Sequence, residues 1–169
     1  ALFVPPLRIA AAAPAGHTAT AEEAPASPGA AVMSGLDVLA AEQFALLAGR
    51  RVGLVTNQTG VDARRRRGID LLAAAPRVKL RAIFSPEHGL TGEAVSDVPH
   101  GRDATTGVPV WSLYGAERRP TAAMLSGIDT LVVDLQDVGA RYYTYLTTLL
   151  YVLDEAARHR IPVVVLDRP

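Results

Sequence analysis

Short apolar runs rich in Val, Leu and Ile alternate along this chain with segments of helical spacing. The clearest run reads T-L-V-V-D-L at 130–135, and similar runs occupy 51–57, 78–84, 108–113 and 162–167. Apolar runs of this length are typical of strands that are buried on both faces, and helices between them supply the crossovers of a parallel sheet. The pattern therefore predicts an α/β fold, a parallel sheet with right-handed crossovers and helices on both faces.

Helices are expected between these strands. The first begins at Asp37, a good capping residue, and runs to about Leu47. Shorter helices are expected at 69–75 and 121–127. The longest helix follows residue 142, and an apolar stripe at 3.6-residue spacing predicts the face that packs on the sheet: Leu146, Leu149, Leu150, Leu153 and Ala157.

Residues 1–34 differ in composition from the rest of the chain. The stretch 10–31 is rich in Ala, Pro, Thr and Glu without a helical or strand period, so it cannot bury enough apolar surface to form a core. Small residues at 11–15 resemble a cleavage site that follows a short apolar run. We expect 1–34 to be a disordered or signal-remnant extension and linker, and 35–169 the folded domain. Export to the periplasm or extracellular space is expected, with a cytoplasmic protein as the alternative.

Composition and missing motifs argue against several function classes. The 17 basic and 17 acidic residues balance, which gives no electrostatic reason to expect nucleic acid as a partner. The chain has no cysteine, its 4 histidines are scattered, and no apolar run approaches the ~18 residues that a membrane-spanning helix needs. No dinucleotide fingerprint, P-loop or G-x-S-x-G motif is present. We therefore expect no metal, no cofactor, no nucleic-acid partner and no membrane span.

Polar side chains follow the C-terminal end of each main strand. In a parallel sheet these ends share one edge, so residues that are distant in sequence converge there. The stretch I-F-S-P-E-H-G at 83–89 is the most informative, because Pro86 ends a strand and Gly89 turns the chain beside a carboxylate and an imidazole. The candidate site residues are Asn57, Gln58, Glu87, His88, Asp134, Gln136, Asp137, Arg141 and Tyr142.

Each candidate has a chemical role and a structural alternative. Glu87 is a candidate general acid if Phe84 and other apolar neighbours raise its pKa by desolvation, and otherwise a carboxylate that accepts from a backbone turn. His88 either orients a substrate or is a structural histidine bonded to a carbonyl group. Asp134 and Asp137 are candidates for a second carboxylate, although Asp134 lies within a strand and would then need a buried partner such as Arg141.

Several blocks of the sequence keep a recognisable order. They are V-G-L-V-T-N-Q-T-G at 52–60, F-S-P-E-H-G-L at 84–90, S-L-Y-G at 112–115, D-L-Q-D-V-G-A-R-Y-Y-T-Y at 134–145 and V-L-D-R-P at 165–169. Together they closely resemble the exo-β-N-acetylmuramidase (NamZ-like) family, long known as a domain of unknown function, over about 35–169. Thr91 and Trp111 depart from the family pattern, in which a basic residue and a smaller ring are expected.

The resemblance implies a glycosidase that releases N-acetylmuramic acid from the non-reducing end of peptidoglycan fragments. It implies a Rossmann-like N-terminal domain that carries the active site, and we expect the chain to be truncated before a C-terminal domain that completes the fold. By match to the E-H-G block, Glu87 is the expected proton donor, with Asp134 or Asp137 as its partner. The residues expected to line the sugar pocket are Asn57, Gln58, His88, Gln136, Arg141 and Tyr142, with Arg141 on the lactyl carboxylate.

Two other interpretations remain at this point. A non-catalytic saccharide-binding α/β module would use the same sheet edge without chemistry. A nucleotide- or phosphate-binding domain would use glycine-rich turns such as 89–92, although the sequence lacks the usual fingerprint.

Overall fold

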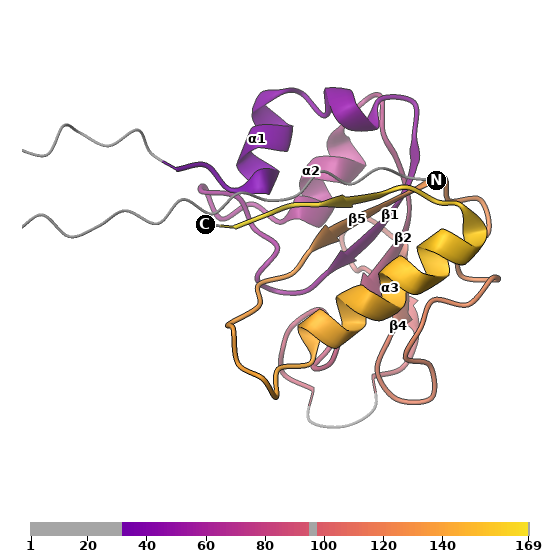
Figure 1. Cartoon of the computed structure of the whole chain (residues 1–169). Helices are drawn as coiled ribbons and strands as arrows, with labels where there is room; N and C mark the ends of the chain where they lie inside the picture. Colours follow the sequence, from indigo (N-terminus) through magenta and orange to yellow (C-terminus); the bar gives the residue numbers. More distant parts are fainter. Residues whose placement is uncertain (1–31, 95–97, 169) are drawn as a thin grey trace, which may run out of the picture. The chain divides into compact units, whose positions relative to one another are not determined.

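A six-stranded sheet forms the centre of the folded part of the chain (Figure 1). In the computed structural model, which describes residues 32–94 and 98–168, the strand order is β3-β4-β2-β1-β5-β6. The strands are β1 (Arg51–Thr56), β2 (Lys79–Ser85), β3 (Gly101–Arg102), β4 (Pro109–Ser112), β5 (Thr130–Asp134) and β6 (Val163–Val165). Every neighbouring pair is parallel except β3 with β4. The predicted α/β fold with a mostly parallel sheet is confirmed.

Helices cover both faces of this sheet. They are α1 (Gly35–Ala41), the 3-10 turn η1 (Ala45–Leu47), α2 (Gly68–Ala74) and α3 (Tyr145–His159). Side chains of α1, η1 and α2 share one core cluster, whereas α3 and residues 124–128 belong to a second cluster. Alternate residues of β1 enter the two clusters, Val52 and Leu54 the first and Val55 the second, as the two-residue period of a strand requires.

The chain changes direction across the sheet beside β1. It runs outward from β1 to β2 and β4, and then returns to place β5 on the other side of β1. In open α/β sheets, ligands bind outside the carboxyl ends of the strands near such a switch point. The carboxyl ends of β1 and β5 are joined in register by the pair Thr56 and Asp134.

The first helix is shorter than the sequence predicted. It ends at Ala41, because Gln43 and Phe44 take left-handed backbone conformations with φ of 53° and 57°. The capping residue is Ser34 rather than Asp37, since the Ser34 Oγ accepts from the Asp37 amide at 3.2 Å. The residues expected in the core of this segment are buried or partly buried there: Leu39, Leu47 and Phe44.

Residues 121–127 form a run of turns, so the short helix expected there is wrong. The Thr121 Oγ1 does accept from the Met124 amide at 3.3 Å, as a helix cap would. The run ends at Gly127, whose φ of 74° is left-handed. This run of turns nevertheless brings Met124 and Leu125 into the core.

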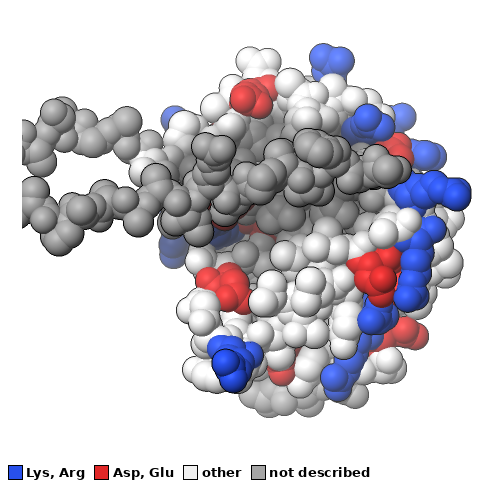
Figure 2. All heavy atoms as spheres, viewed as in Figure 1, with Lys and Arg blue, Asp and Glu red and all other residues white. Residues whose placement is uncertain are grey.

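The predicted core-facing stripe of α3 is wrong, although the helix itself is present. Its buried residues are Tyr145, Thr148, Val152, Glu155 and Ala156. Leu146, Leu150 and Leu153 are 57%, 56% and 38% exposed, and within the predicted stripe only Leu149 packs against the core. A polar contact accompanies this rotation, since the Tyr145 hydroxyl accepts from the Asn57 side chain at 2.8 Å. The surface over α3 is accordingly mostly uncharged until its C-terminal end, where charged side chains gather (Figure 2).

Residues 1–31, 95–97 and 169 lie outside the described part of the chain. The predicted extension, its cleavage site and export therefore stay predictions. From Val32 onward the chain forms one compact unit. In that described part, no helix has both the length and the apolar character needed to cross a bilayer.

Gly35→Ala is expected to destabilise this unit. The Gly35 amide donates to the Asp167 carbonyl at 2.7 Å, and a Cβ at Gly35 would lie 2.7–2.8 Å from backbone atoms of Leu166 and Asp167. Backbone atoms cannot move aside as a flexible side chain can, so we expect a loss of about 1–3 kcal/mol in the free energy of unfolding by urea. Gly101→Ala is the matched control, because nothing lies within 4 Å of its added Cβ. Equal stability of the two variants would contradict the close approach.

Candidate active site

The parallel register of β2 and β4 places Glu87 and Tyr114 at one point of the sheet edge. The two strands pair from Ile83 with Val110 to Ser85 with Ser112, and the Leu113 amide continues the ladder by donating to the Ser85 carbonyl at 2.8 Å. Glu87 and Tyr114 each follow these last paired residues by the same short interval. Because parallel strands advance in step, the two side chains arrive at the same edge.

Local turns hold both residues in place. After β2, the Gly89 amide donates to the Pro86 carbonyl at 3.0 Å, and both His88 and Gly89 have left-handed φ values, of 68° and 72°. After β4, the Ser112 hydroxyl accepts from the Tyr114 amide at 3.2 Å and donates to the Tyr114 carbonyl at 2.9 Å. The positions of Glu87 and Tyr114 are thus set by backbone geometry rather than by side-chain packing alone.

Glu87 is bound by hydroxyl groups. The Thr144 Oγ1 donates to the Glu87 Oε2 at 2.7 Å. Thr144 is the N-cap residue of α3, yet its side chain caps no amide of that helix. A carboxylate beside a helix N-terminus is also favoured by the helix dipole. The Thr144 side chain at the start of α3 therefore binds Glu87 instead of capping the helix.

These contacts make Glu87 more acidic than usual. Hydrogen bonds from Thr144 and then from Tyr114 hold the pKa of Glu87 below its ordinary value, the nearby His88 and Arg118 charges act in the same direction, and desolvation opposes them. The expected condition for a ready general acid, a pKa raised by apolar neighbours, is not met. Phe84, the neighbour invoked, is fully buried in the core cluster beneath α3.

A pocket of about 260 Å³ opens beside Glu87. Its lining combines one acidic and one basic side chain with several hydroxyl groups: Glu87, Leu113, Tyr114, Arg118, Thr144, Thr147, Thr148 and Tyr151. Hydroxyl-rich walls around one carboxylate suit a neutral polyol such as a sugar, because each hydroxyl both donates and accepts. We call this the Glu87 pocket.

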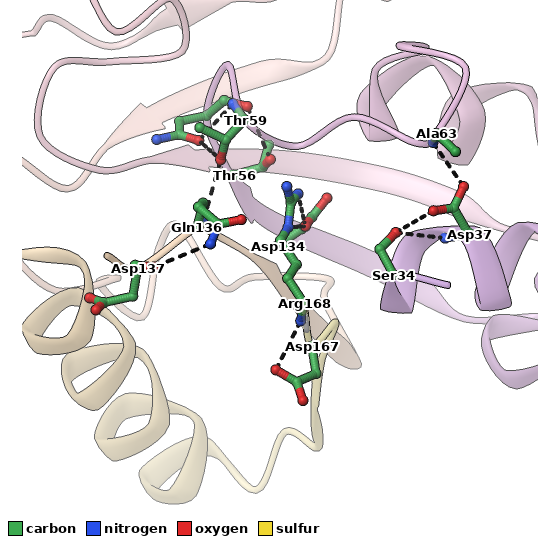
Figure 3. A network of polar contacts seen from close by, with 11 residues as sticks. Ser34, Asp37, Thr56, Thr59, Ala63, Asp134, Gln136, Asp137, Asp167 and Arg168 are labelled. Atoms are coloured by element: carbon green, nitrogen blue, oxygen red, sulfur yellow. Dashed lines mark hydrogen bonds and ion pairs between the residues drawn. The ribbon is translucent and has the colours of Figure 1, made fainter. Parts of the chain in front are cut away.

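Asp134 lies at the switch point but is held by an ion pair. Its Oδ1 accepts from the Arg168 Nε at 3.2 Å and more closely from the Arg168 Nη2 (Figure 3). The sequence suggested Arg141 as the buried partner, and this was wrong. Burial raises the pKa of Asp134, while the Arg168 guanidinium opposes that rise. This ion pair is the kind of contact expected of the structural alternative for Asp134, and its catalytic role stays a prediction.

Glycines leave space around the second oxygen of Asp134. The Oδ2 has no hydrogen-bond partner among the described residues. Cβ atoms added at Gly60 and Gly68 would lie 3.1 Å and 3.4 Å from it. The Asp134 side chain is only 1% exposed, so an incoming sugar cannot reach it without a rearrangement of these loops.

Asn57 is engaged within the fold. Its Nδ2 donates to the Tyr145 hydroxyl at 2.8 Å, and its Oδ1 accepts from the amide and hydroxyl of Thr59 at 3.0 Å and 2.7 Å. Thr59 in turn contacts the Gln136 amide, at 3.4 Å (Figure 3). Asn57 therefore connects the C-terminal end of β1 with the start of α3 at the sheet edge.

Gln58 lies at a second pocket, on the other side of the sheet edge. This pocket has a volume of about 540 Å³, and its charged lining residues are Arg67, Arg102 and Asp103. The Arg67 guanidinium bridges Asp70 and Asp103 at 2.6 Å and 2.8 Å. The charge of Arg67 is thus already balanced within the fold. The Gln58 side chain lies close to Gly92, since a Cβ added at Gly92 would lie 2.3 Å from the Gln58 Nε2.

The remaining predicted residues lie in loops. The His88 Nδ1 lies 2.8 Å from the Ala94 carbonyl oxygen, a contact expected of its structural alternative, and its role toward a substrate stays a prediction. Asp137 accepts from the Gly139 amide at 2.7 Å, and the Gln136 side chain donates to the Asp137 carbonyl at 3.2 Å (Figure 3). Arg141 and Tyr142 are exposed in the loop before α3. None of these residues lines the Glu87 pocket among the residues that the structure describes.

Sequence reasoning missed three residues around Glu87. Tyr114 and Thr144 lie within blocks that carried the family resemblance, so their positions were marked without a role. Arg118 lies in no such block, and no local pattern identifies it. Among the described ranges, no set of three or more His, Asp or Glu side chains is arranged to share a metal ion.

Thr144→Val is expected to raise the pKa of Glu87 toward its ordinary value. The variant removes the strongest donor to the carboxylate, and a titration of the Glu87 carboxyl signal by NMR measures the result. Since a lowered native pKa stabilises the fold above the unfolded pKa and is lost on acidification, the variant should lose about 1 kcal/mol at neutral pH and less at acidic pH. Thr147→Val, one helical turn away in the same pocket, should leave that pKa in place.

Arg168→Gln is expected to destabilise the fold by roughly 3–5 kcal/mol at neutral pH, because it leaves a buried carboxylate without its cation. Loss of the guanidinium raises the pKa of Asp134 further above its unfolded value. The native variant then binds a proton that the unfolded chain releases, so its deficit should shrink as the pH falls. Urea unfolding at two pH values measures this, with the exposed Arg64→Gln as control; a deficit that grows on acidification would refute the role of the pair.

This chain is similar to a known protein family and to solved structures. The model of the family "Exo-beta-N-acetylmuramidase NamZ, N-terminal" matches residues 52–169. The chain is 44% identical over 140 residues to the peptidoglycan beta-N-acetylmuramidase NamZ of Bacillus subtilis (strain 168). The aligned region covers 82% of this chain and 34% of that protein. The chain thus spans about a third of the length of this relative.

Two crystal structures of DUF1343 family proteins from Bacteroides fragilis NCTC 9343 have the same fold. The first superposes with a TM-score of 0.75 at 45% identity, over 81% of this chain and 34% of that one. The second has a TM-score of 0.67 at 34% identity, over 81% and 35%. With the family match over most of the chain, we conclude that this chain belongs to the exo-β-N-acetylmuramidase NamZ N-terminal family.

Proposed function

We propose that this chain carries the Glu87 centre of a glycosidase that releases N-acetylmuramic acid from the non-reducing end of peptidoglycan fragments. Family membership supports the substrate class, because the Bacillus subtilis relative is described as a peptidoglycan beta-N-acetylmuramidase. The observation that carries the proposal is the hydrogen bond from Thr144 to Glu87, which fixes a carboxylate at the mouth of a hydroxyl-lined pocket.

In this proposal Glu87 protonates the glycosidic oxygen. The free carboxyl group is ionised at neutral pH, so substrate binding must raise its pKa before it donates a proton. A bound sugar does this in two ways, because its hydroxyl groups compete for the Thr144 and Tyr114 hydroxyls and because it excludes water from the pocket. Glu87 then matches the raised-pKa acid that glycosidases use.

The second catalytic group lies outside the Glu87 pocket as described. Most glycosidases use a second carboxylate, but Asp134 is ion-paired and Asp137 caps a turn. The chain spans about a third of its relatives' length, so further polypeptide is one source of that group. The exposed leucines of α3 offer an apolar surface on which such polypeptide would pack. Completion of the fold by a C-terminal domain therefore stays a prediction.

The proposed partners are peptidoglycan-derived saccharides. Export of the protein is part of the same proposal. It rests on the composition of residues 1–34 alone.

Glu87→Gln is expected to slow release of N-acetylmuramic acid from a chromogenic β-glycoside by ~10²-fold or more, since amide replacement removes the proton donor. The assay uses the full-length gene product, with the exposed Glu42→Gln as matched control. Equal rates for the parent and Glu87→Gln would remove Glu87 from the mechanism.

The same experiment tests the alternative function. If neither protein releases the sugar at any pH, while both remain folded and bind the saccharide, the chain is a non-catalytic saccharide-binding module.

A further inference from the structure

We propose that Arg118 binds the lactyl carboxylate of N-acetylmuramic acid in the Glu87 pocket and so selects this sugar over N-acetylglucosamine. The inference rests on the proposed function, because it assigns the substrate's distinguishing group to a residue of the same pocket. N-acetylmuramic acid differs from N-acetylglucosamine by an ether-linked lactyl group that carries one negative charge. A cation near the substrate pocket would let an enzyme separate the two sugars, because it attracts this charge.

Arg118 is a cation that forms no salt bridge within the described residues, although its charge acts on the Glu87 carboxylate. It lines the pocket with Glu87, and no carboxylate within residues 32–94 and 98–168 forms an ion pair with it. Its neighbour Arg119 is the opposite case, since it is paired with Asp154 and lies 4.1 Å from the centroid of the Tyr151 ring. Of the two adjacent arginines, one is committed to the fold and the other is available to a ligand.

The pocket lining holds one negative and one positive side chain, and of the two only Arg118 would attract an anionic ligand. Glu87, the acidic residue of the lining, already accepts hydrogen bonds from Thr144 and Tyr114. A ligand carboxylate would therefore find its partner in the guanidinium group, whose planar donors match a carboxylate in a bidentate arrangement. The hydroxyls of Thr147 and Tyr151 remain for the neutral part of the sugar.

Arg141 was the sequence-based candidate for the same role. It lies in the exposed loop before α3 and does not belong to the pocket lining of the described chain. The geometry therefore favours Arg118, and the two arginines make opposite predictions for one experiment.

The test measures binding to the full-length gene product by calorimetry. The ligands are N-acetylmuramic acid, its carboxamide (in which the carboxylate is replaced by a neutral amide) and N-acetylglucosamine. We expect the parent to prefer the acid over the amide by about 10- to 100-fold, the range of a charge-assisted hydrogen-bonded pair. Arg118→Gln should reduce this preference to near one while retaining amide binding, and Arg118→Lys should keep part of it. Arg64→Gln, a change at an exposed arginine that does not line the Glu87 pocket, should keep all of it.

Several outcomes would overturn the inference. They are equal binding of acid and amide by the parent, no binding of either, an equal loss of both in Arg118→Gln, or loss of the preference in Arg141→Gln instead. Release of the sugar from a chromogenic glycoside is measured alongside. Hydrolysis without an Arg118-dependent preference would support the proposed function and refute the role of Arg118. An Arg118-dependent preference without hydrolysis would support the role of Arg118 and refute the proposed function.

Discussion

Parallel pairing of β1 with both β2 and β5 is the constraint on which the rest of this structure depends. It aligns the carboxyl ends of strands that are far apart in sequence, so that the turns after them open onto one edge. The pairing of β2 with β4 extends that edge to Glu87 and Tyr114. Without this alignment, neither residue would have a neighbour with which to form a pocket.

Polar contacts at this sheet edge are of two kinds, those that hold the strand ends together and those that bind Glu87. Asp134 with Arg168, and Asn57 with Tyr145, tie together the ends of β1, β5 and β6 and the start of α3. Buried groups of this kind cost free energy unless they are satisfied, which is why they are held by short direct contacts. Glu87 is different, since it lines a pocket and its donors are hydroxyl groups, for which the proposed sugar would compete. The same sheet edge therefore contains polar residues that hold the ends of the strands together, and one carboxylate, that of Glu87, that lines a pocket.

The prediction for α3 shows where sequence patterns fail. Its leucine stripe has correct helical spacing, yet the helix buries Tyr145, Thr148 and Glu155, and leaves Leu146 and Leu150 exposed. Periodicity counts apolar residues on a face and contains no information about a distant hydrogen-bond partner such as Asn57. Similarly, Asp134 needed a buried cation, but Arg168 and Arg141 follow it at distances along the chain that no local rule distinguishes.

By itself, the sequence determined the α/β class, the strands other than β3, and the position of Glu87 after a strand that ends just before Pro86. These follow from apolar periodicity and backbone restriction, which act over a few residues. The family resemblance added a substrate class. Only the tertiary structure decided that Thr144, Tyr114 and Arg118 surround Glu87, that its pKa is lowered, and that Asp134 is held by Arg168. Each of these depends on contacts between residues that are distant along the chain, and strand register and helix rotation set those contacts.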